Sequence, residues 1–146
     1  MYLVKKISRK ESQECHEIDL MTIKLWNHKQ WEEELRKNYV YAFACFKNYQ
    51  IIGICIFQKI FSNAELTYLS INPTFKRRGL GKKLLKETFK QCESVAIEKI
   101  QLEVSDKNLD ALNFYHTFGF ETIGIRKKYY KDGSNALLHE KKLLKK

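Results

Sequence analysis

The amino-acid sequence predicts a mixed α/β fold (α+β), in which about seven strands form one central sheet with helices on both faces. Runs of β-branched and aromatic residues alternate with segments whose apolar residues recur at helical spacing, in the order βααβββαβαββ. A chain of 146 residues that is 44% hydrophobic can bury one substantial core. It has one proline, six glycines and no linker-like block, so we expect residues 1–146 to form a single domain.

The first elements are predicted to be one strand followed by two helices. Residues 2–7 alternate weakly between apolar and polar side chains, as a strand does. Apolar side chains recur at helical spacing over residues 8–25, which predicts a helix there. Asn27 is a residue type that caps helices, and a short helix that holds Trp31 and Leu35 is expected to follow it.

An antiparallel meander of three strands is predicted next. The segment "YVYAFACFKNYQIIGICIFQKIF" consists of two β-branched and aromatic runs around a turn near Asn48, which is typical of a hairpin. The segment "ELTYLSI" follows as the third strand. Pro73 lacks the N–H group that a strand ladder needs and restricts Asn72 before it, so this strand is expected to end there.

The remaining elements alternate between helices and strands. Apolar residues from Leu80 to Cys92 fall on one stripe of a helix, and a strand is predicted over residues 99–105. Residues 109–118 have a helical pattern, and Gly119 is placed to end that helix in a left-handed conformation. Two closing strands, over residues 121–129 and 135–143, flank the turn signal "KDGS".

Charge and cysteine spacing narrow the class of protein. A formal net charge of +10 favours ligands that carry phosphate, but does not choose among nucleic acid, a ribosomal surface and a small polyanionic cofactor. The cysteines at positions 15, 45, 55 and 92 form no CxxC pair, so neither a disulfide framework nor a metal site is expected. No apolar run approaches the roughly 18 to 20 residues that cross a bilayer, and none resembles a signal peptide. We therefore expect a cytoplasmic protein without a membrane partner.

The segment "FKRRGLGKK", residues 75–83, combines two glycines with five basic side chains directly before the predicted helix. Gly79 and Gly81 allow the backbone to approach a ligand closely, and N–H groups at a helix N-terminus bind phosphate. A P-loop is excluded because a single residue separates the glycines, and a dinucleotide fingerprint because Leu84 stands where a third glycine is needed. A solvated basic turn remains the alternative at this point.

A candidate base and a candidate acid follow in the sequence. Glu103 is the acid of the strand "KIQLEVS", on the face opposite Ile100, Leu102 and Val104, and a carboxylate in a central strand could act as a general base. An exposed glutamate or an ion pair with a lysine is the alternative. Tyr115 lies on the apolar face of a predicted helix and is either a buried aromatic residue or a proton donor to a thiolate.

The ordered segments "YLSINPTFKRRGLGKKLL", "LEVSDKNLDALNFYHTFGF" and "IRKKYY" resemble the GCN5-related N-acetyltransferase (GNAT) superfamily and, within it, the RimI-type ribosomal-protein-alanine N-acetyltransferases. The resemblance is close over residues 65–130 and implies a GNAT fold that uses acetyl-CoA. It implies that the backbone of residues 69–71 pairs with the pantetheine arm and that the amides of residues 77–82 hold the pyrophosphate. The implied cofactor site comprises Leu69, Ser70, Ile71, Arg77, Arg78, Gly79, Leu80, Gly81, Lys82 and Asn108.

The resemblance also implies roles in catalysis and in acceptor binding. Glu103 would accept the proton of the amine, through water, and Tyr115 would protonate the sulfur leaving group. The acceptor side would be lined by Leu25, Trp26, Tyr129 and Tyr130. An ammonium of pKa about 8 must lose its proton before it attacks a thioester, so one base and one acid allow direct attack in a ternary complex without an acyl-cysteine.

Some residues depart from the family pattern. Lys76 stands where Gln or Arg is usual, which keeps a basic side chain beside the phosphates. Leu25 replaces a proline before Trp26, Lys128 replaces an asparagine before the tyrosine pair, and "NALL" replaces an acidic-Ala run. These three changes lie on the acceptor side, so the sequence predicts the cofactor more firmly than the acceptor.

The leading hypothesis is an N-α-acetyltransferase that acts on the N-terminal alanine of a small-subunit ribosomal protein, and so works near the ribosome. A rival acetyltransferase would modify other protein N-termini, a lysine side chain or a small amine. A rival of another class is a basic nucleic-acid-binding module. Specific nucleic-acid binding is not expected, because the basic residues gather at one turn and in the terminal segment "HEKKLLKK" instead of on a face with interleaved aromatics.

Overall fold

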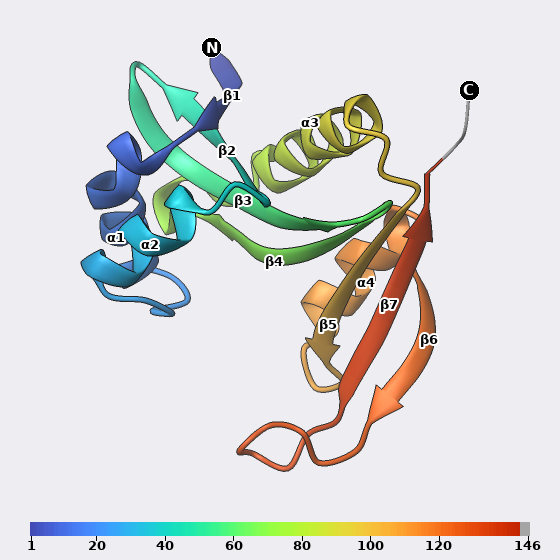
Figure 1. Ribbon diagram of the computed structural model, residues 1–146. Coiled ribbons are helices and arrows are strands. Elements are labelled where there is room, and N and C mark those ends of the chain that lie inside the picture. The colour runs from blue at the N-terminus through green and yellow to red at the C-terminus, as the bar shows by residue number, and fades with distance from the viewer. Residues whose placement is uncertain (144–146) are drawn as a thin grey trace.

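The computed structural model describes residues 1–143, and within them the chain forms seven strands and four α-helices (Figure 1). The last three residues of the basic segment "HEKKLLKK" lie outside the described range. The strands are β1 (Tyr2–Ile7), β2 (Val40–Lys47), β3 (Gln50–Ile60), β4 (Asn63–Ile71), β5 (Lys99–Ser105), β6 (Glu121–Arg126) and β7 (Ala136–Lys142). The α-helices are α1 (Ser12–Leu20), α2 (His28–Arg36), α3 (Leu80–Ser94) and α4 (Leu109–Thr117), and the 3-10 turns are η1 (Arg9–Glu11) and η2 (Pro73–Phe75).

The strands form one mixed sheet in the order β1-β2-β3-β4-β5-β7-β6. All neighbouring pairs are antiparallel except β4 and β5, which are parallel. A parallel pair needs a long crossover connection, and α3 supplies it. The mixed sheet and its order confirm the predicted fold class.

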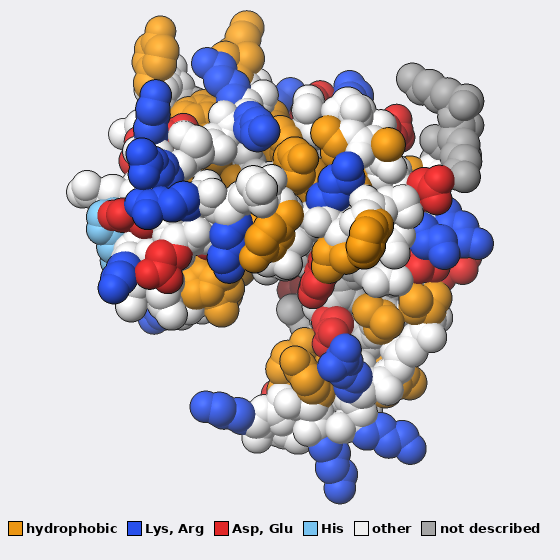
Figure 2. All heavy atoms as spheres, in the orientation of Figure 1, with side chains coloured by type: hydrophobic (Ala, Val, Ile, Leu, Met, Phe, Trp, Pro, Cys, Tyr) orange, Lys and Arg blue, Asp and Glu red, His pale blue; other side chains and the backbone are white. Residues whose placement is uncertain are grey.

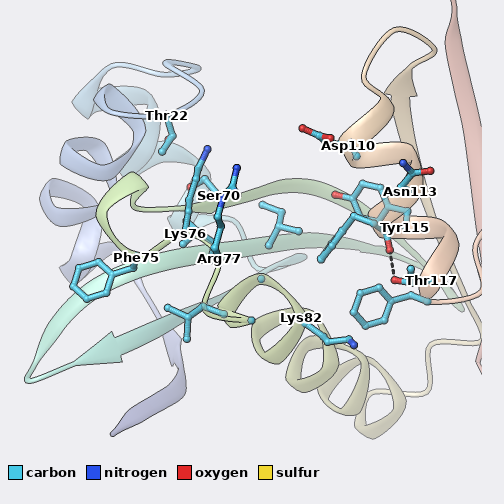
Figure 3. Close-up of a pocket in the computed structure, with 18 of the residues that line it drawn as sticks. Thr22, Ser70, Phe75, Lys76, Arg77, Lys82, Asp110, Asn113, Tyr115 and Thr117 are labelled. Carbon is cyan, nitrogen blue, oxygen red and sulfur yellow. Dashed lines mark hydrogen bonds between the residues drawn. The ribbon is translucent and has the colours of Figure 1, made fainter.

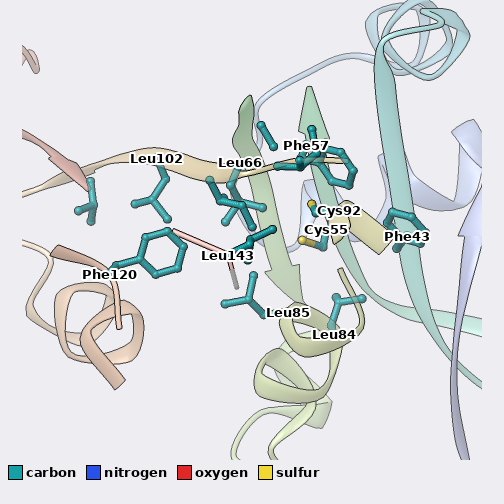
Figure 4. Packing of buried hydrophobic residues seen from close by; sticks show 14 residues of the cluster. Phe43, Cys55, Phe57, Leu66, Leu84, Leu85, Cys92, Leu102, Phe120 and Leu143 are labelled. Atoms are coloured by element: carbon teal, nitrogen blue, oxygen red, sulfur yellow. The ribbon is translucent and has the colours of Figure 1, made fainter. Parts of the chain in front are cut away.

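Helices cover both faces of the sheet, and β3 shows why. Ile54 and Ile56 pack into a cluster with Ile18 of α1 and Trp31 of α2. The alternate residues of β3 point to the other face, where Cys55 and Phe57 join a cluster with residues of α3, including Leu84, Leu85 and Cys92 (Figure 4). Both faces of β3 are buried, which explains its almost continuous apolar sequence.

The sheet splits between β4 and β5. The two strands pair only where residues 63–65 face residues 99–101, and beyond that point their ribbons diverge (Figure 1). A β-bulge in β4 lies at the start of the divergence, because Leu66 pairs with Phe57 and Tyr68 with Ile56, which leaves Thr67 without a partner in that register. The extra residue bends the strand and moves Tyr68 to the face opposite Leu66.

Some predicted boundaries were wrong. The predicted helix over residues 8–25 is instead the turn η1, capped by Ser8, followed by α1, which ends at Leu20. Residues 21–27 form a loop in which Lys24 adopts a left-handed conformation with φ of 59°. Strand β6 ends at Arg126, three residues before the predicted end, and β7 covers residues 136–142 of the predicted 135–143. The predicted left-handed conformation at Gly119 is confirmed, with φ of 87°.

Candidate active site

A cleft of about 990 Å³ lies where β4 and β5 separate. Its walls come from the loop after α1, the end of β4, the turn before α3 and the inner face of α4 (Figure 3). The lining residues are Met21, Thr22, Ile23, Leu69, Ser70, Ile71, Phe75, Lys76, Arg77, Gly79, Leu80, Gly81, Lys82, Asp110, Ala111, Asn113, Phe114, Tyr115, Thr117 and Phe118. The space-filling view shows the surface hollowed between the part built on β1–β4 and the part formed by β6 and β7 (Figure 2).

The N-terminus of α3 faces this cleft. Gly79 precedes the helix with φ of 74°, a left-handed conformation that glycine adopts without the steric cost of a Cβ. The first N–H groups of a helix have no intrahelical acceptor, and Gly79 has no side chain that could cap those of α3. These N–H groups stand at the positive end of the helix dipole, and the basic residues Lys76, Arg77 and Lys82 line the same cleft. Together they form a site suited to an anion.

Arg78 does not line the cleft with its neighbours. Its Nη1 donates a hydrogen bond of 3.2 Å to the hydroxyl of Tyr2, and its guanidinium lies 5.1 Å from the centre of the Phe75 ring. The side chain therefore attaches the outside of the glycine turn to β1. A direct contact between Arg78 and the cofactor stays a prediction, and within this structure the side chain is engaged elsewhere.

The end of β4 presents an unpaired strand edge to the cleft. Residues 69–71 pair with β3 on one side, whereas pairing with β5 stops at Glu65. The backbone groups on the β5 side are therefore available to an extended ligand, which can hydrogen-bond to them as an added strand would. Leu69, Ser70 and Ile71 all line the cleft, next to the N-terminus of α3.

Tyr115 reaches the same cleft from α4. Its ring packs edge-on against Phe114, at 5.3 Å between ring centres, and against Phe120, at 5.6 Å. Burial raises the pKa of the Tyr115 hydroxyl well above its usual value, and the neighbouring Cys55 adds to the effect. The hydroxyl therefore carries its proton at neutral pH and can donate a hydrogen bond to negative charge that develops in the cleft.

Glu103 lies on the other face of β5 and does not line the cleft. Its Oε1 is 3.4 Å from Nη2 of Arg126, with a quarter of the Glu103 side chain exposed. Burial raises the pKa of the Tyr130 hydroxyl, and the charge of nearby Glu103 raises it further. Arg126 also lies over the ring of Tyr129, 5.6 Å from its centre. The structure thus brings Glu103 together with both tyrosines of the predicted acceptor side, on the opposite face of the sheet from Tyr115.

The other predicted acceptor residues lie in the loop after α1. Trp26 stacks on Tyr68 at 6.0 Å and meets Trp31 edge-on at 4.9 Å, so its ring packs against the core below α1 and α2. Leu25 is 46% exposed. Neither lines the cleft, but the three residues Met21, Thr22 and Ile23 of the same loop do.

Asn108 caps α4, because its side-chain oxygen accepts a hydrogen bond of 3.2 Å from the N–H of Ala111. The capping role that the sequence left open is therefore present. A ligand contact by the same side chain stays a prediction, since Asn108 is not among the residues that line the cleft.

Two groups of lining residues were missed by the sequence reading. Asp110, Asn113, Phe114 and Thr117 of α4 follow one another at helical spacing, so the periodicity of that helix could have indicated them. The loop residues 21–23 were assigned to a helix, and the loop depends on hydrogen bonds of Asp19 to Leu25 and to the distant Tyr68, which helical periodicity does not reveal.

Among residues 1–143, no group of three or more histidine, cysteine or acidic side chains is arranged to hold a metal ion. Over the same residues, no helix combines the length and apolar character needed to cross a membrane.

Comparison with known proteins identifies the family. A family model described as "Acetyltransferase (GNAT) family" matches residues 3–120. A Bacillus subtilis (strain 168) protein, provisionally named a ribosomal protein bS18-alanine N-acetyltransferase, is 30% identical over 115 residues, which cover 77% of this chain and 76% of that protein.

Solved structures agree with the fold. The ribosomal-protein-S18-alanine N-acetyltransferase from Escherichia coli aligns with a TM-score of 0.91 at 22% identity, covering 100% of this chain and 96% of that one. Arabidopsis thaliana NAA60 in complex with acetyl-CoA aligns with a TM-score of 0.84 at 13% identity, covering 98% and 99% of the two chains. The motifs, the sheet split at β4 and β5 and the family match lead to one conclusion: the chain is an acetyltransferase of the GNAT family.

Proposed function

We propose that the protein is an acetyl-CoA-dependent N-α-acetyltransferase that modifies the N-terminal alanine of a small-subunit ribosomal protein. The observation that carries the proposal is one cleft in which an uncapped helix N-terminus, an unpaired strand edge and a protonated tyrosine meet. Relatives of this family are named for acetylating the alanine of ribosomal protein bS18, and that acceptor is carried over from them. Such an enzyme would work in the cytoplasm, near the ribosome.

The residues of the cleft fit acetyl-CoA. A Cβ built on Gly81 would approach Phe114 to 3.6 Å, so a side chain there would enter the space between the turn and α4. The open backbone at Gly79 and Gly81 suits a pyrophosphate held by amides, and the edge of residues 69–71 suits an extended arm with amide groups. Acetyl-CoA supplies an acetyl group as a thioester.

Proton transfers are assigned to two residues. Glu103 accepts a proton from the acceptor ammonium through water, which leaves the free amine that attacks, because its carboxylate lies beside the predicted acceptor residues and outside the cleft wall. Tyr115 holds its proton at neutral pH and donates it to the sulfur as the carbon–sulfur bond breaks, because the same burial that raises the tyrosine pKa also disfavours a charged thiolate. The two groups stand on opposite faces of β5, so base and acid reach the gap between the strands from opposite sides.

The burial of the cysteines supports direct attack of the amine on the thioester. Cys15, Cys45, Cys55 and Cys92 are all buried. Burial raises the pKa of Cys15 and of Cys55 to about 12 and raises that of Cys92 still further. Because the thiolate is the nucleophilic form, these thiols are unsuited to carrying an acetyl group between substrates. We therefore propose a ternary complex in which the amine attacks without an acyl-enzyme.

A panel of acceptors tests the proposal. The enzyme is incubated with acetyl-CoA and peptides that begin with alanine, serine, glycine or methionine, together with an N-blocked lysine peptide and free polyamines. Mass spectrometry is expected to find acetylation on the α-amine of the alanine peptides. Activity confined to polyamines or to lysine side chains would contradict the proposed acceptor and leave the acetyltransferase assignment intact.

A further inference from the structure

The loop of residues 21–27 forms one wall of the cleft, and backbone hydrogen bonds to the end of α1 hold only its first part, through the N–H groups of Met21, Thr22 and Lys24. Met21, Thr22 and Ile23 line the cleft, and Met21 and Ile23 are about half exposed. Lys24 is in a left-handed conformation, so the loop turns sharply after the lining residues. A wall built this way needs an anchor from outside the loop.

Asp19 provides that anchor from the last turn of α1. Its side chain is fully buried, and its Oδ2 accepts hydrogen bonds from the N–H groups of Leu25 and Trp26, both at 2.9 Å, and from Nε1 of Trp31 at 3.1 Å. Its Oδ1 accepts from the hydroxyl of Tyr68 at 2.8 Å. A carboxylate at a helix C-terminus opposes the helix dipole, so α1 itself gains nothing from Asp19. What the carboxylate stabilises is the path of the loop.

The same network reaches the neighbouring wall of the cleft, which β4 forms. The Tyr68 hydroxyl, on β4, accepts from Oγ of Ser70 at 3.2 Å and lies 3.4 Å from Oγ1 of Thr22. Ser70 belongs to the strand edge proposed for the cofactor, whereas Thr22 belongs to the loop. Figure 3 shows Thr22 and Ser70 on the same side of the cleft, away from Tyr115. One carboxylate is therefore bonded to the loop and, through Tyr68, to the strand.

We propose that Asp19 is a positioning residue that fixes the loop of residues 21–27 relative to β4, so that the loop is preformed for the acceptor peptide. The inference rests on the proposed function and deepens it, because it assigns the acceptor wall of the same cleft. Asp19 does not touch the reacting atoms. Its effect is on how tightly the acceptor binds, through the shape of the wall.

The Asp19→Asn variant tests this with little change in volume. An amide places its NH2 group either toward the Tyr68 hydroxyl or toward the three N–H donors at Oδ2, and its neutral oxygen accepts more weakly than a carboxylate. The KM for an alanine peptide is expected to rise about tenfold, as when a hydrogen bond to a charged group is weakened, with kcat nearly unchanged. The Kd for acetyl-CoA, measured by calorimetry, is expected to change less than about twofold.

Hydrogen exchange supplies a readout that does not depend on any acceptor. The amides of Leu25 and Trp26 are expected to exchange at least about tenfold faster in Asp19→Asn, because their acceptor is weakened.

Glu17→Gln is the matched control, since Glu17 is an exposed acid of the same helix, and it is expected to leave both KM and exchange unchanged. Tyr68→Phe removes the hydroxyl that links Asp19 to β4 and contacts Thr22, but keeps the three bonds at Oδ2, and should raise KM by a smaller factor while Leu25 and Trp26 stay protected.

The outcomes separate this inference from the proposed function. A folded Asp19→Asn protein with unaltered peptide KM and unaltered exchange at Leu25 and Trp26 would overturn the positioning role. An equal loss of acetyl-CoA affinity would also overturn it, by showing a general effect on the cleft. If no alanine peptide is acetylated even by the unaltered enzyme, the proposed acceptor fails, and exchange alone decides the role of Asp19. If Asp19→Asn does not fold, an unchanged KM in Tyr68→Phe contradicts the inference and a raised KM supports it.

Discussion

Gly79 and Gly81 lie two residues apart, yet the structure gives them different reasons to be glycine. Gly79 has φ of 74° and open space around its Cβ position, so its constraint is backbone conformation. Gly81 lies inside the first turn of α3 with an ordinary φ, and an added Cβ would meet Phe114 at normal contact distance. A substitution at Gly81 therefore tests ligand approach without straining the backbone.

We predict opposite effects on stability for alanine at these two positions. Gly79→Ala is expected to lower the free energy of unfolding by about 1 kcal/mol, the cost of a left-handed conformation with a Cβ. Gly81→Ala is expected to leave it unchanged or raise it by up to about 1 kcal/mol, because alanine favours a helix. If the amides at this turn hold the pyrophosphate, Gly81→Ala still raises the Kd for acetyl-CoA at least about tenfold. Thermal unfolding measures the stability of both variants, and calorimetry measures their Kd for acetyl-CoA. An unchanged Kd in Gly81→Ala would contradict the view that Gly81 lets the backbone approach the pyrophosphate closely.

Glu103 and Tyr115 are predicted to affect turnover in distinct ways. Glu103→Gln should lower kcat by about 10²-fold or more at neutral pH and recover part of it at high pH, where the free amine is abundant. Tyr115→Phe should lower kcat with little change in acetyl-CoA affinity, because only the proton donor is lost. Initial rates from pH 6 to 10 provide the measurement, and rates that match the unaltered enzyme across that range would exclude both residues from catalysis.

At the scale of elements, the bulge at Thr67 explains how the cleft opens. Leu66 packs toward α3, whereas Tyr68, two residues later, packs toward α1 and α2, which a regular strand does not allow. The extra residue bends β4 away from β5 just after their three paired positions. It also turns Tyr68 toward Asp19, so the same irregularity opens the cleft and supplies the anchor of its loop.

Deleting Thr67 is predicted to straighten β4. In the shortened strand Leu66 and Tyr68 would occupy successive positions of a regular ladder and keep their present faces, so the protein should still fold. The β4–β5 pairing would extend, the cleft would narrow, and the Kd for acetyl-CoA should rise more than about tenfold. The substitution Thr67→Ala keeps the bulge and serves as the control. Full acetyl-CoA affinity in a folded deletion variant would contradict the role given to the bulge.

Most elements could be predicted from the sequence because local patterns determine them. The strands β1 and β5 have the predicted bounds, and in β5 the alternation matches one buried face. The helix predicted over residues 8–25 ends early because Asp19 accepts from Leu25 and Trp26, a contact that helical periodicity does not encode. The bulge at Thr67 likewise depends on pairing with β3. The glycine turn and Tyr115 were predicted as site residues, whereas the ion pair of Glu103 with Arg126 arises from the order of the sheet.

At the scale of the whole molecule, His139 links stability to pH. The side chain is buried on β7, and its Nδ1 lies 3.1 Å from Oγ1 of Thr122. Burial lowers the pKa of His139 below its usual value, and the nearby His116 lowers it further. The folded protein therefore keeps the ring neutral at a pH at which the unfolded chain takes up a proton.

The sign of the pH effect follows from that difference. Above the unfolded-state pKa of about 6.5, His139 is neutral in both the folded and the unfolded state, so it does not lower the free energy of unfolding. As the pH falls below about 6.5, only the unfolded state gains a proton, so the free energy of unfolding falls by at most about 1.4 kcal/mol per pH unit. Denaturant unfolding between pH 5 and 8 is expected to show this decline, and His139→Gln to reduce it, with the exposed His28→Gln as control. An identical decline in His139→Gln would rule out this residue as its cause.

At this scale, one split sheet places the basic turn before α3 and the loop after α1 around the same cleft. A net charge of +10 raises the local concentration of phosphate-bearing ligands of any kind. The charge itself does not select the acceptor. We propose that selection depends on the loop of residues 21–27, which contacts β4, and on the tyrosines near Glu103 of β5, so that the two groups flank the split.

The most direct test of the proposed activity is mass spectrometry of protein N-termini from cells with and without this enzyme. The proposal predicts that one small-subunit ribosomal protein with an N-terminal alanine is acetylated in the first sample and carries a free α-amine in the second. Expression of the Glu103→Gln variant should leave most of that N-terminus free. An acetylation pattern of ribosomal N-termini that is identical in the presence and absence of the enzyme would contradict the proposed function.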